Sequence, residues 1–182
     1  MTRRGYLGRR AVAALEFVLV APFFIIMTFG IIEFAAAVRI QMGINQAAWS
    51  VADLIAQQTD VTTAQLNDFY KAAQDCNSFN VGTLSISATS VTFSAGQPTG
   101  SVAWTAHTAT SNYATNPANV TTVSSGLGAS SGGTTIGGDS TIVVQATSTF
   151  NVPIAFGPIS KSYTLTSTAF ARPRLSYTVS LN

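Results

Sequence analysis

Few side chains in this sequence could take part in catalysis or bind a metal. The 182 residues include one cysteine, Cys76, and one histidine, His107, and a single acidic residue, Asp139, follows Cys76. A nucleophile–base pair or a pair of catalytic carboxylates therefore cannot be assembled in the C-terminal half. One cysteine also excludes an internal disulfide, and we expect a buried or free thiol. The remaining aspartates recur every seven or eight residues and are interpreted as solvated helix positions: Asp53, Asp60, Asp68 and Asp75. We expect a protein that is not an enzyme and holds neither a metal nor a cofactor.

Glu16 is the residue whose position most clearly implies chemistry. Glu16 and Glu33 are the only charged residues between Ala11 and Val38. A charged side chain near the centre of a bilayer costs about 2.5–3.5 kcal/mol, so such a carboxylate usually has a partner or a task. Alternatively, Glu16 reaches water at the membrane surface or pairs with the preceding arginines. We expect Glu33 at the outer interface, and at about 100° per residue the two carboxylates point roughly 100° apart.

The apolar segment that contains these glutamates predicts a membrane-spanning helix. Residues 11–38 would extend about 42 Å as a helix, which is ample for a hydrocarbon core of about 30 Å. Four arginines precede the segment and Arg39 follows it. The positive-inside rule therefore predicts a cytoplasmic basic leader over residues 1–11, a span over residues 12–38, and export of everything that follows.

The composition excludes several classes of protein. Only 9% of the residues are charged and 47% are apolar, whereas a disordered chain needs low hydrophobicity and high charge. Residues 1–39 have a net charge of +3 and residues 40–182 a net charge of −1. The basic character thus belongs to the leader, and no basic face for nucleic acid is expected.

Two helical patterns follow the membrane segment within residues 39–80. Ile44, Ala48, Val51 and Ile55 fall on one helix face. We expect the first helix to continue to about Gln58, with this stripe packed in the core of the exported domain rather than against a second subunit.

A second helix is predicted from about Thr63 to Asp75. The segment Thr62-Thr63-Ala64-Gln65 has the spacing of a capping box, in which a threonine and a glutamine three residues later bond each other's backbone N–H groups. The apolar side of this helix is expected to comprise Leu66, Phe69, Tyr70 and Ala73.

Residues 81–182 are rich in serine, threonine and valine and carry only four charges. Apolar residues alternate with polar ones in several stretches, which predicts half-buried antiparallel strands. The expected fold class is α+β: a long N-terminal membrane helix, a short helix and an antiparallel sheet, with a flexible loop at about 109–139. The alternating sets are Leu84/Ile86, Val102/Trp104/Ala106, Ile142/Val144/Ala146, Tyr163/Leu165 and Leu175/Tyr177/Val179/Leu181.

Two kinds of export signal fit the N-terminus. A secretory signal would be cut after Ala37, within a run of small residues, although the apolar segment is longer than usual and contains a glutamate. A prepilin-type signal would be cut between Ala11 and Val12, which makes Glu16 the fifth residue of the mature chain.

Several residues at fixed spacing carry a family resemblance: Arg9-Arg10, Glu16-Phe17, Pro22, Phe29-Gly30 and Glu33-Phe34. Together they resemble the N-terminus of the TadE/TadG-like family, pilin-like proteins of the tight-adherence (Flp-type) pilus system. Leu165–Leu175 is more weakly similar to the closing strand of that family. The resemblance implies a type IV pilin-like helix, processed between Ala11 and Val12 by a prepilin peptidase. Such peptidases prefer glycine where this chain has Ala11.

The resemblance also implies a mechanism. Glu16 would pair with the free N-terminal amine of a neighbouring subunit, because an ammonium partner offsets much of the cost of a carboxylate in an apolar bundle. We assign subunit registration to Glu16, Phe17 and Pro22, and expect Pro22 to kink or loosen the helix.

The resemblance implies a minor pilin or pseudopilin, a single-pass protein of the bacterial inner membrane with its C-terminal domain in the periplasm or outside the cell. Implied partners are a prepilin peptidase, the major pilin, other TadE/TadF/TadG-like subunits, the inner-membrane platform and membrane lipid. The alternatives are an uncleaved TadG-like scaffold or tip protein, and a secreted binding or adhesin domain.

Overall fold

The structure is a computed structural model that describes residues 3–76, 84–94, 100–107, 130–131, 134–135, 138–151 and 162–182. Residues 3–10, 130–131 and 134–135 are described through their backbone only. The chain divides into two compact units, residues 1–39 with 152–161 and residues 40–151 with 162–182.

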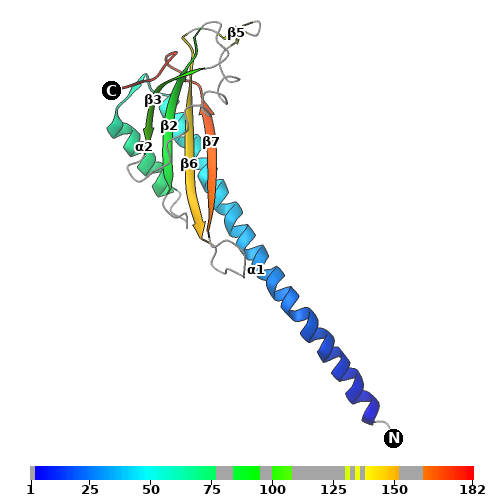
Figure 1. Cartoon of the computed structure of the whole chain (residues 1–182). Helices are drawn as coiled ribbons and strands as arrows, with labels where there is room; N and C mark the ends of the chain where they lie inside the picture. The colour runs from blue at the N-terminus through cyan, green and yellow to red at the C-terminus, as the bar shows by residue number, and fades with distance from the viewer. Residues whose placement is uncertain are drawn as a thin grey trace. The chain divides into compact units, whose positions relative to one another are not determined.

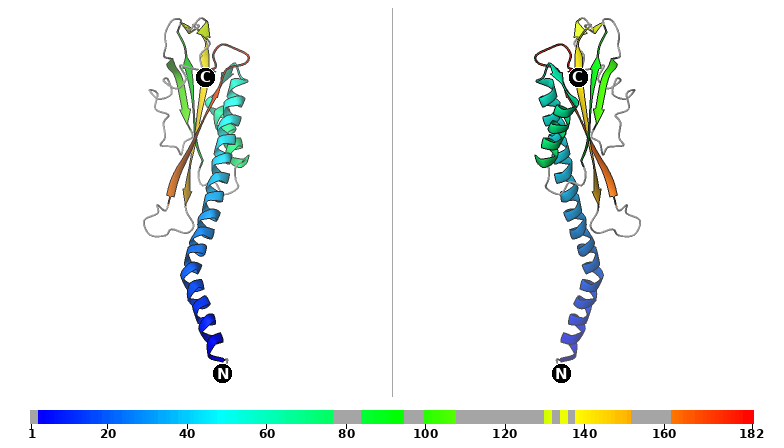
Figure 2. Two further views of the ribbon diagram at one scale, coloured as in Figure 1. Left: turned by 90° about the vertical axis from the view of Figure 1, so that its right-hand side faces the viewer. Right: turned by 90° about the vertical axis from the view of Figure 1, so that its left-hand side faces the viewer.

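Within the first unit, the structure describes the N-terminal part of helix α1. The whole helix runs from Arg3 to Ala56. The helix continues through Pro22, and Figure 2 shows a bend in its N-terminal half. A proline removes one backbone hydrogen bond from a helix and its ring crowds the preceding turn, which is a physical reason for such a bend.

The second unit combines the C-terminal part of α1, helix α2 (Thr63–Cys76) and a four-stranded antiparallel sheet in the order β3-β2-β6-β7. Both helices lie on one face of this sheet (Figures 1 and 2). The α+β class and the two predicted helices are therefore confirmed. The strands of the sheet are β2 (Ser85–Thr92), β3 (Ser101–His107), β6 (Ser140–Asn151) and β7 (Ser162–Ala171).

Two pairs of very short strands accompany the main sheet. Strand β1 (Asp60–Val61) pairs in parallel with β8 (Ser180–Leu181), and β4 (Ser130–Ser131) pairs with β5 (Thr134–Thr135). Most of the predicted loop at 109–139 lies outside the described residues.

The start of α2 is held by the predicted capping box. The backbone N–H of Thr62 donates to Gln65 Oε1 at 2.9 Å, and the backbone N–H of Gln65 donates to Thr62 Oγ1 at 3.2 Å. Leu66, Tyr70 and Ala73 are buried on the apolar side of the helix, whereas Phe69 is half-buried.

The core of the second unit lies between the helices and the sheet. All four residues of the predicted stripe on α1 are fully buried, so the stripe packs within this domain as expected. The facing strands contribute Ile86 and Ala88 from β2, with the alternating set of β6 opposite them. Many of these side chains are alanines, which allow a helix to approach a sheet closely.

The other face of the sheet is rich in hydroxyl groups. Thr89 Oγ1 and Thr105 Oγ1 lie 3.3 Å apart across β2 and β3, and Thr147 Oγ1 and Thr166 Oγ1 lie 3.4 Å apart across β6 and β7. A small apolar cluster on this face comprises Val91, Phe93 and Val143, with Phe170 packed against it.

Gly100 marks a close approach beside this cluster. A Cβ atom at this position would overlap the side chain of Val91 and lie 2.9 Å from Phe93 Cε1. Only glycine fits here without displacing the cluster.

The predicted strand over Leu175, Tyr177, Val179 and Leu181 is wrong for most of its length. Only Ser180–Leu181 forms a strand, its pairing is parallel, and Leu175 and Tyr177 are 70% and 81% exposed. Individual hydrogen bonds to residues distant in the sequence hold this segment in place. For example, the indole N–H of Trp104 donates to the carbonyl of Val179 at 2.7 Å. Helix α1 also ends at Ala56, two residues before the expected end.

Replacement of Thr62 by alanine should lower the free energy of unfolding by about 1 kcal/mol, because the N-terminal cap of α2 loses its hydroxyl acceptor. Thr63→Ala is the matched control, since Thr63 is exposed and lies just inside the helix. Urea unfolding of the detergent-solubilised chain measures both. Equal losses in the two variants would contradict the role of the cap.

We expect Tyr70 to lower the free energy of unfolding as the pH becomes alkaline. Burial raises the pKa of the Tyr70 phenol above its ordinary value, although a hydrogen bond to the backbone of Ala88 acts in the opposite direction. Above about pH 10 the unfolded chain ionises this phenol while the folded chain keeps it protonated, so stability falls as pH rises. In Tyr70→Phe, urea midpoints measured from about pH 8 to about pH 11 should fall less steeply; an unchanged slope would contradict this assignment.

Candidate functional site

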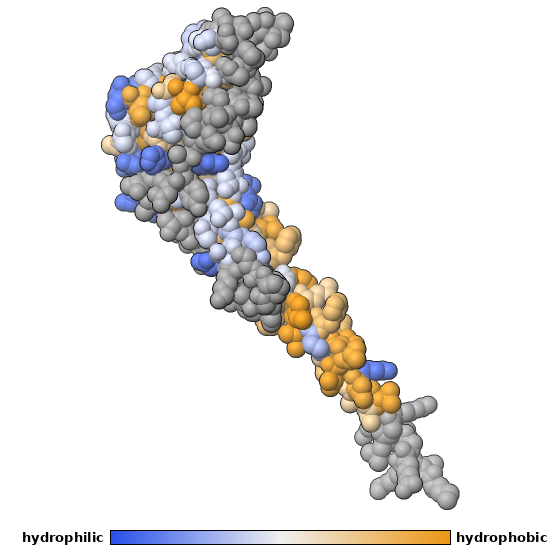
Figure 3. Space-filling model, viewed as in Figure 1, coloured by the Kyte–Doolittle hydropathy of each residue, from blue (hydrophilic) through white to orange (hydrophobic). Residues whose placement is uncertain are grey.

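The N-terminal part of α1 exposes an unusually apolar surface. It is coloured orange along the helix in Figure 3. Among the described residues, α1 is the one helix long and apolar enough to cross a membrane, judged by its length and composition over Ala11–Ala56. Large exposed apolar patches mark contacts with lipid or with other proteins. The exposed side chains of this part include Val12, Leu15, Phe17, Val18, Leu19, Val20, Phe23, Phe24, Ile25, Ile26, Met27, Ile31, Ile32 and Phe34.

All the residues predicted to act in processing and assembly lie on this surface. Ala11, Val12, Glu16, Phe17 and Pro22 are exposed members of α1. Val12 and Glu16 are four residues apart, so their side chains lie one above the other on the same face. Their common face could present a carboxylate beside the start of a chain cut before Val12.

The peptide bond between Ala11 and Val12 lies inside α1, eight residues after the helix begins at Arg3. Backbone groups in a helix are committed to hydrogen bonds one turn away. A peptidase that binds its substrate in an extended form would therefore have to unwind the helix locally at this bond.

Two polar side chains in the same segment, Thr28 and Glu33, differ in their hydrogen bonding. The hydroxyl of Thr28 donates to the carbonyl of Phe24 at 2.8 Å, so it needs no external partner. Glu33 Oε1 is buried, and no hydrogen-bond partner for it exists among the described residues. A carboxylate removed from water needs a donor. Glu33 is thus a second position at which α1 could accept a donor.

The second unit contains a groove where its C-terminal segment crosses α1. Its volume is about 830 Å³, and its lining comes from α1, from the residue before β6, and from residues 170–177. Three exposed apolar side chains border it: Trp49, Leu175 and Tyr177.

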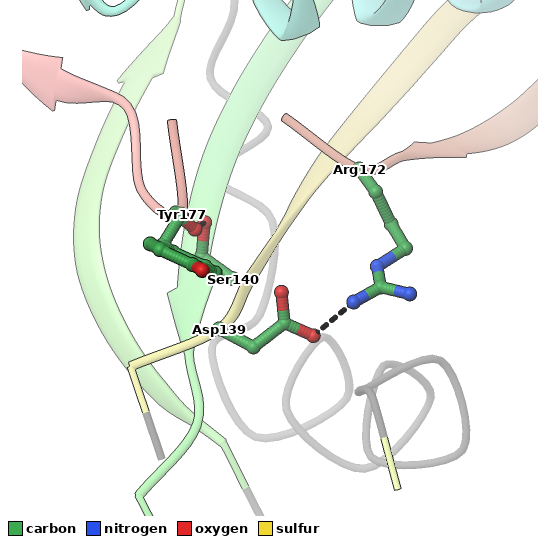
Figure 4. Close-up of polar contacts among 4 residues, drawn as sticks. All are labelled: Asp139, Ser140, Arg172 and Tyr177. Carbon is green, nitrogen blue, oxygen red and sulfur yellow. Dashed lines mark hydrogen bonds and ion pairs between the residues drawn. The ribbon is translucent and has the colours of Figure 1, made fainter. Parts of the chain in front are cut away.

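Two ion pairs fasten the C-terminal segment beside this groove. Arg172 Nη2 lies 2.5 Å from Asp139 Oδ2, as Figure 4 shows. The Asp139 side chain is only 9% exposed, whereas that of Arg172 is 53% exposed. Arg174 pairs with Asp53 on α1, and both of these side chains are substantially exposed.

Hydrogen bonds to backbone carbonyls also attach the C-terminal segment to the rest of the second unit. The N–H of Arg174 donates to the carbonyl of Ala56 at 2.8 Å, which satisfies a carbonyl at the C-terminal end of α1. The Ser140 hydroxyl donates to the carbonyl of Tyr177 at 2.8 Å, and these two residues lie together in Figure 4. The chain end is thus tied to both α1 and β6.

The sequence did not identify these ion pairs. Asp53 was interpreted as a solvated helix position, and its arginine partner lies 121 residues away. The signal that could have found them is the scarcity of charge: Asp139, Arg172 and Arg174 are three of only four charged residues after Val81.

The described residues contain no group of three or more histidine, cysteine or acidic side chains that could hold a metal ion. The thiol of Cys76 is free and exposed at the end of α2, and His107 ends β3.

Comparison with protein-family models gives a match between residues 11–53 and the TadE-like protein family. The matched segment includes Glu16, Pro22 and Glu33, so the resemblance predicted from the N-terminal residues is confirmed. The match indicates a protein related to the Tad pilus with an N-terminal helix of the membrane type. Comparisons with curated proteins and with solved structures give no match.

Replacement of Arg172 by glutamine should cost about 1–3 kcal/mol of folding stability, because the nearly buried Asp139 carboxylate loses a charged donor. Arg174→Gln should cost less than about 1 kcal/mol, because the Arg174–Asp53 pair is exposed and screened by water. Urea unfolding of both variants beside the parent chain tests the difference. A larger loss for Arg174→Gln would reverse this ranking.

Proposed function

We propose that this chain, whose residues 11–53 match the TadE-like family, is a minor pilin or pseudopilin that acts in the assembly of a tight-adherence (Flp-type) pilus. The observation that carries the proposal is the coincidence of that match with an exposed apolar helix bearing Glu16. We also infer that the chain is not an enzyme.

We propose that the helix inserts into the bacterial inner membrane. Residues 1–11 form the cytoplasmic leader, residues 12–38 span the bilayer, and residues 39–182 lie in the periplasm or outside the cell. The exposed apolar side chains of α1 support this arrangement because they suit a hydrocarbon environment. The arginines on the N-terminal side support its orientation.

A prepilin peptidase cuts the bond between Ala11 and Val12 in this proposal. The first turns of α1 unwind before the cut, and the new amine at Val12 then begins a helix that carries Glu16 one turn later. The continuous helix through this bond, together with alanine in place of glycine before it, favours one alternative: an uncleaved TadG-like scaffold or tip protein that keeps its leader.

Glu16 registers one subunit against the next. A neighbouring subunit's N-terminal ammonium offsets much of the cost of the carboxylate within an apolar bundle. Phe17 contributes apolar contact area beside it, and Pro22 sets the local bend of the helix. The partners are then the prepilin peptidase, the major pilin, sister TadE/TadF/TadG-like subunits, the membrane platform and lipid.

Replacement of Glu16 by alanine or glutamine should leave processing intact but reduce piliation and surface adherence at least about tenfold, the loss of one strong ionic contact. Glu16→Asp keeps the charge and should retain more function than Glu16→Gln. Electron microscopy and adherence assays in the native host measure these effects. Wild-type piliation in Glu16→Gln would remove Glu16 from the mechanism.

Mass spectrometry of the N-terminus separates the alternatives in the same strains. A mature chain that begins at Val12 supports the pilin proposal, and an intact leader supports the uncleaved scaffold. A chain that begins at Val38 would contradict both.

A further inference from the structure

Strand β7 is an edge strand of the four-stranded sheet, and its own sequence lacks the residues that usually protect such an edge. It pairs with β6 from Ser162 to Ala171 without a register shift, and no other described strand pairs with its outer side. Its ten residues include no charged residue and no proline. Edge strands normally carry charges, prolines or bulges that prevent pairing with another chain.

One contact within the chain identifies the outer side of β7 and already occupies the carbonyl of Thr166. The side-chain amide of Gln41 donates to the carbonyl of Thr166 at 3.2 Å. In an antiparallel ladder the N–H and C=O groups of one residue point to the same side, and alternate residues repeat that direction. The backbone groups of Thr164 and Thr168 therefore point to the same side as those of Thr166.

Strand β3 forms the opposite edge of the sheet and matches β7 in direction. Because all four strands alternate in direction, β3 and β7 run antiparallel to each other. Two copies of the chain that share one orientation can therefore place β7 of one copy antiparallel to β3 of the next. Strand β3 has no lysine, arginine or acidic residue.

The faces of the two edges also correspond. Thr105 on β3 and Thr166 on β7 lie on the same hydroxyl-rich face, since register aligns Thr105 with Thr89, Val143 and Phe170, and Thr166 lies four residues before Phe170. A neighbouring copy shifted along the strand so that Thr105 faces Thr166 sets threonines beside one another, and threonine pairs stabilise neighbouring strands. A register shift beside Ala103 limits regular pairing to the end of β3 at Trp104–His107.

We propose that copies of this chain join edge to edge, with Thr164–Ser167 of β7 in one copy pairing antiparallel with Trp104–His107 of β3 in the next. The contact is heterologous, so it continues the sheet from subunit to subunit and closes into a ring or extends as a helical array. The inference rests on the proposed function, because insertion into one membrane gives neighbouring copies their common orientation.

Cross-linking of the full-length chain in host membranes tests this contact. The background is Cys76→Ser, which removes the exposed native thiol. One tagged copy carries Thr164→Cys and a differently tagged copy carries His107→Cys, both at exposed positions. A short bismaleimide should give a dimer that contains both tags. Thr164→Cys paired with Gln57→Cys, another exposed position, is the control and should give at least about tenfold less.

A second pair of variants tests the backbone contact itself. Thr166→Pro removes an N–H group on the outer side of β7 and spares the ladder to β6, and Thr166→Ala is its control. The proline should reduce the mixed dimer at least about tenfold, whereas the alanine should leave it unchanged.

Three results would overturn the inference: no mixed dimer, equal cross-linking of Thr164→Cys to itself, or transfer of the cross-link to a different pilin. The N-terminal mass of the same samples separates these failures from failure of the proposed function. A chain that begins at Val12 but forms no mixed dimer contradicts only the edge-to-edge contact.

Discussion

The structure of the second unit depends on the packing of one stripe of α1 against one face of the sheet. The stripe and its neighbours are small or β-branched, and the facing strands contribute several alanines, so the helix and the sheet approach closely. Close packing of small side chains leaves little room for changes of volume. The same helix has the opposite requirement over residues 11–39, where its large apolar side chains point outward. One continuous helix thus has an exposed apolar part and a packed part. The change falls near Ile40, the first buried residue among those of α1 whose side chains the structure describes.

Charge is scarce for different reasons in different parts of the chain. In the apolar part of α1 it is excluded by the candidate membrane environment, which leaves Glu16 and Glu33 as isolated carboxylates. In the sheet, hydroxyl groups replace ions, and threonines bond one another across the strands. The arginines that follow β7 both form ion pairs, and these pairs attach the end of the chain to β6 and to α1.

Local patterns predicted local structure well. The capping box at Thr62 and Gln65, the buried stripe of α1 and the alternation in β6 each depend on residues close in sequence, and each was found as expected. The site residues could be placed on α1 because apolar length alone defines such a helix. The strand order, the ion pairs and the path of residues 172–179 depend on contacts more than 30 residues apart. The alternation at Leu175 and Tyr177 therefore gave a wrong prediction of a strand. A hydrogen bond from the Trp104 side chain, rather than pairing with a strand, holds that segment in place.

The attachment of the last residues to the beginning of the domain has a kinetic consequence. Strand β8 and the backbone of Arg174 complete contacts with β1 and with the end of α1, which are made more than 100 residues earlier in synthesis. Contacts of such long separation form late and slow the folding of a domain. A chain that is synthesised from its N-terminus delivers Arg174 and β8 after all the other elements of this domain. The contacts that join β8 to β1, and Arg174 to the end of α1, therefore form only after the four strands of the main sheet have been synthesised.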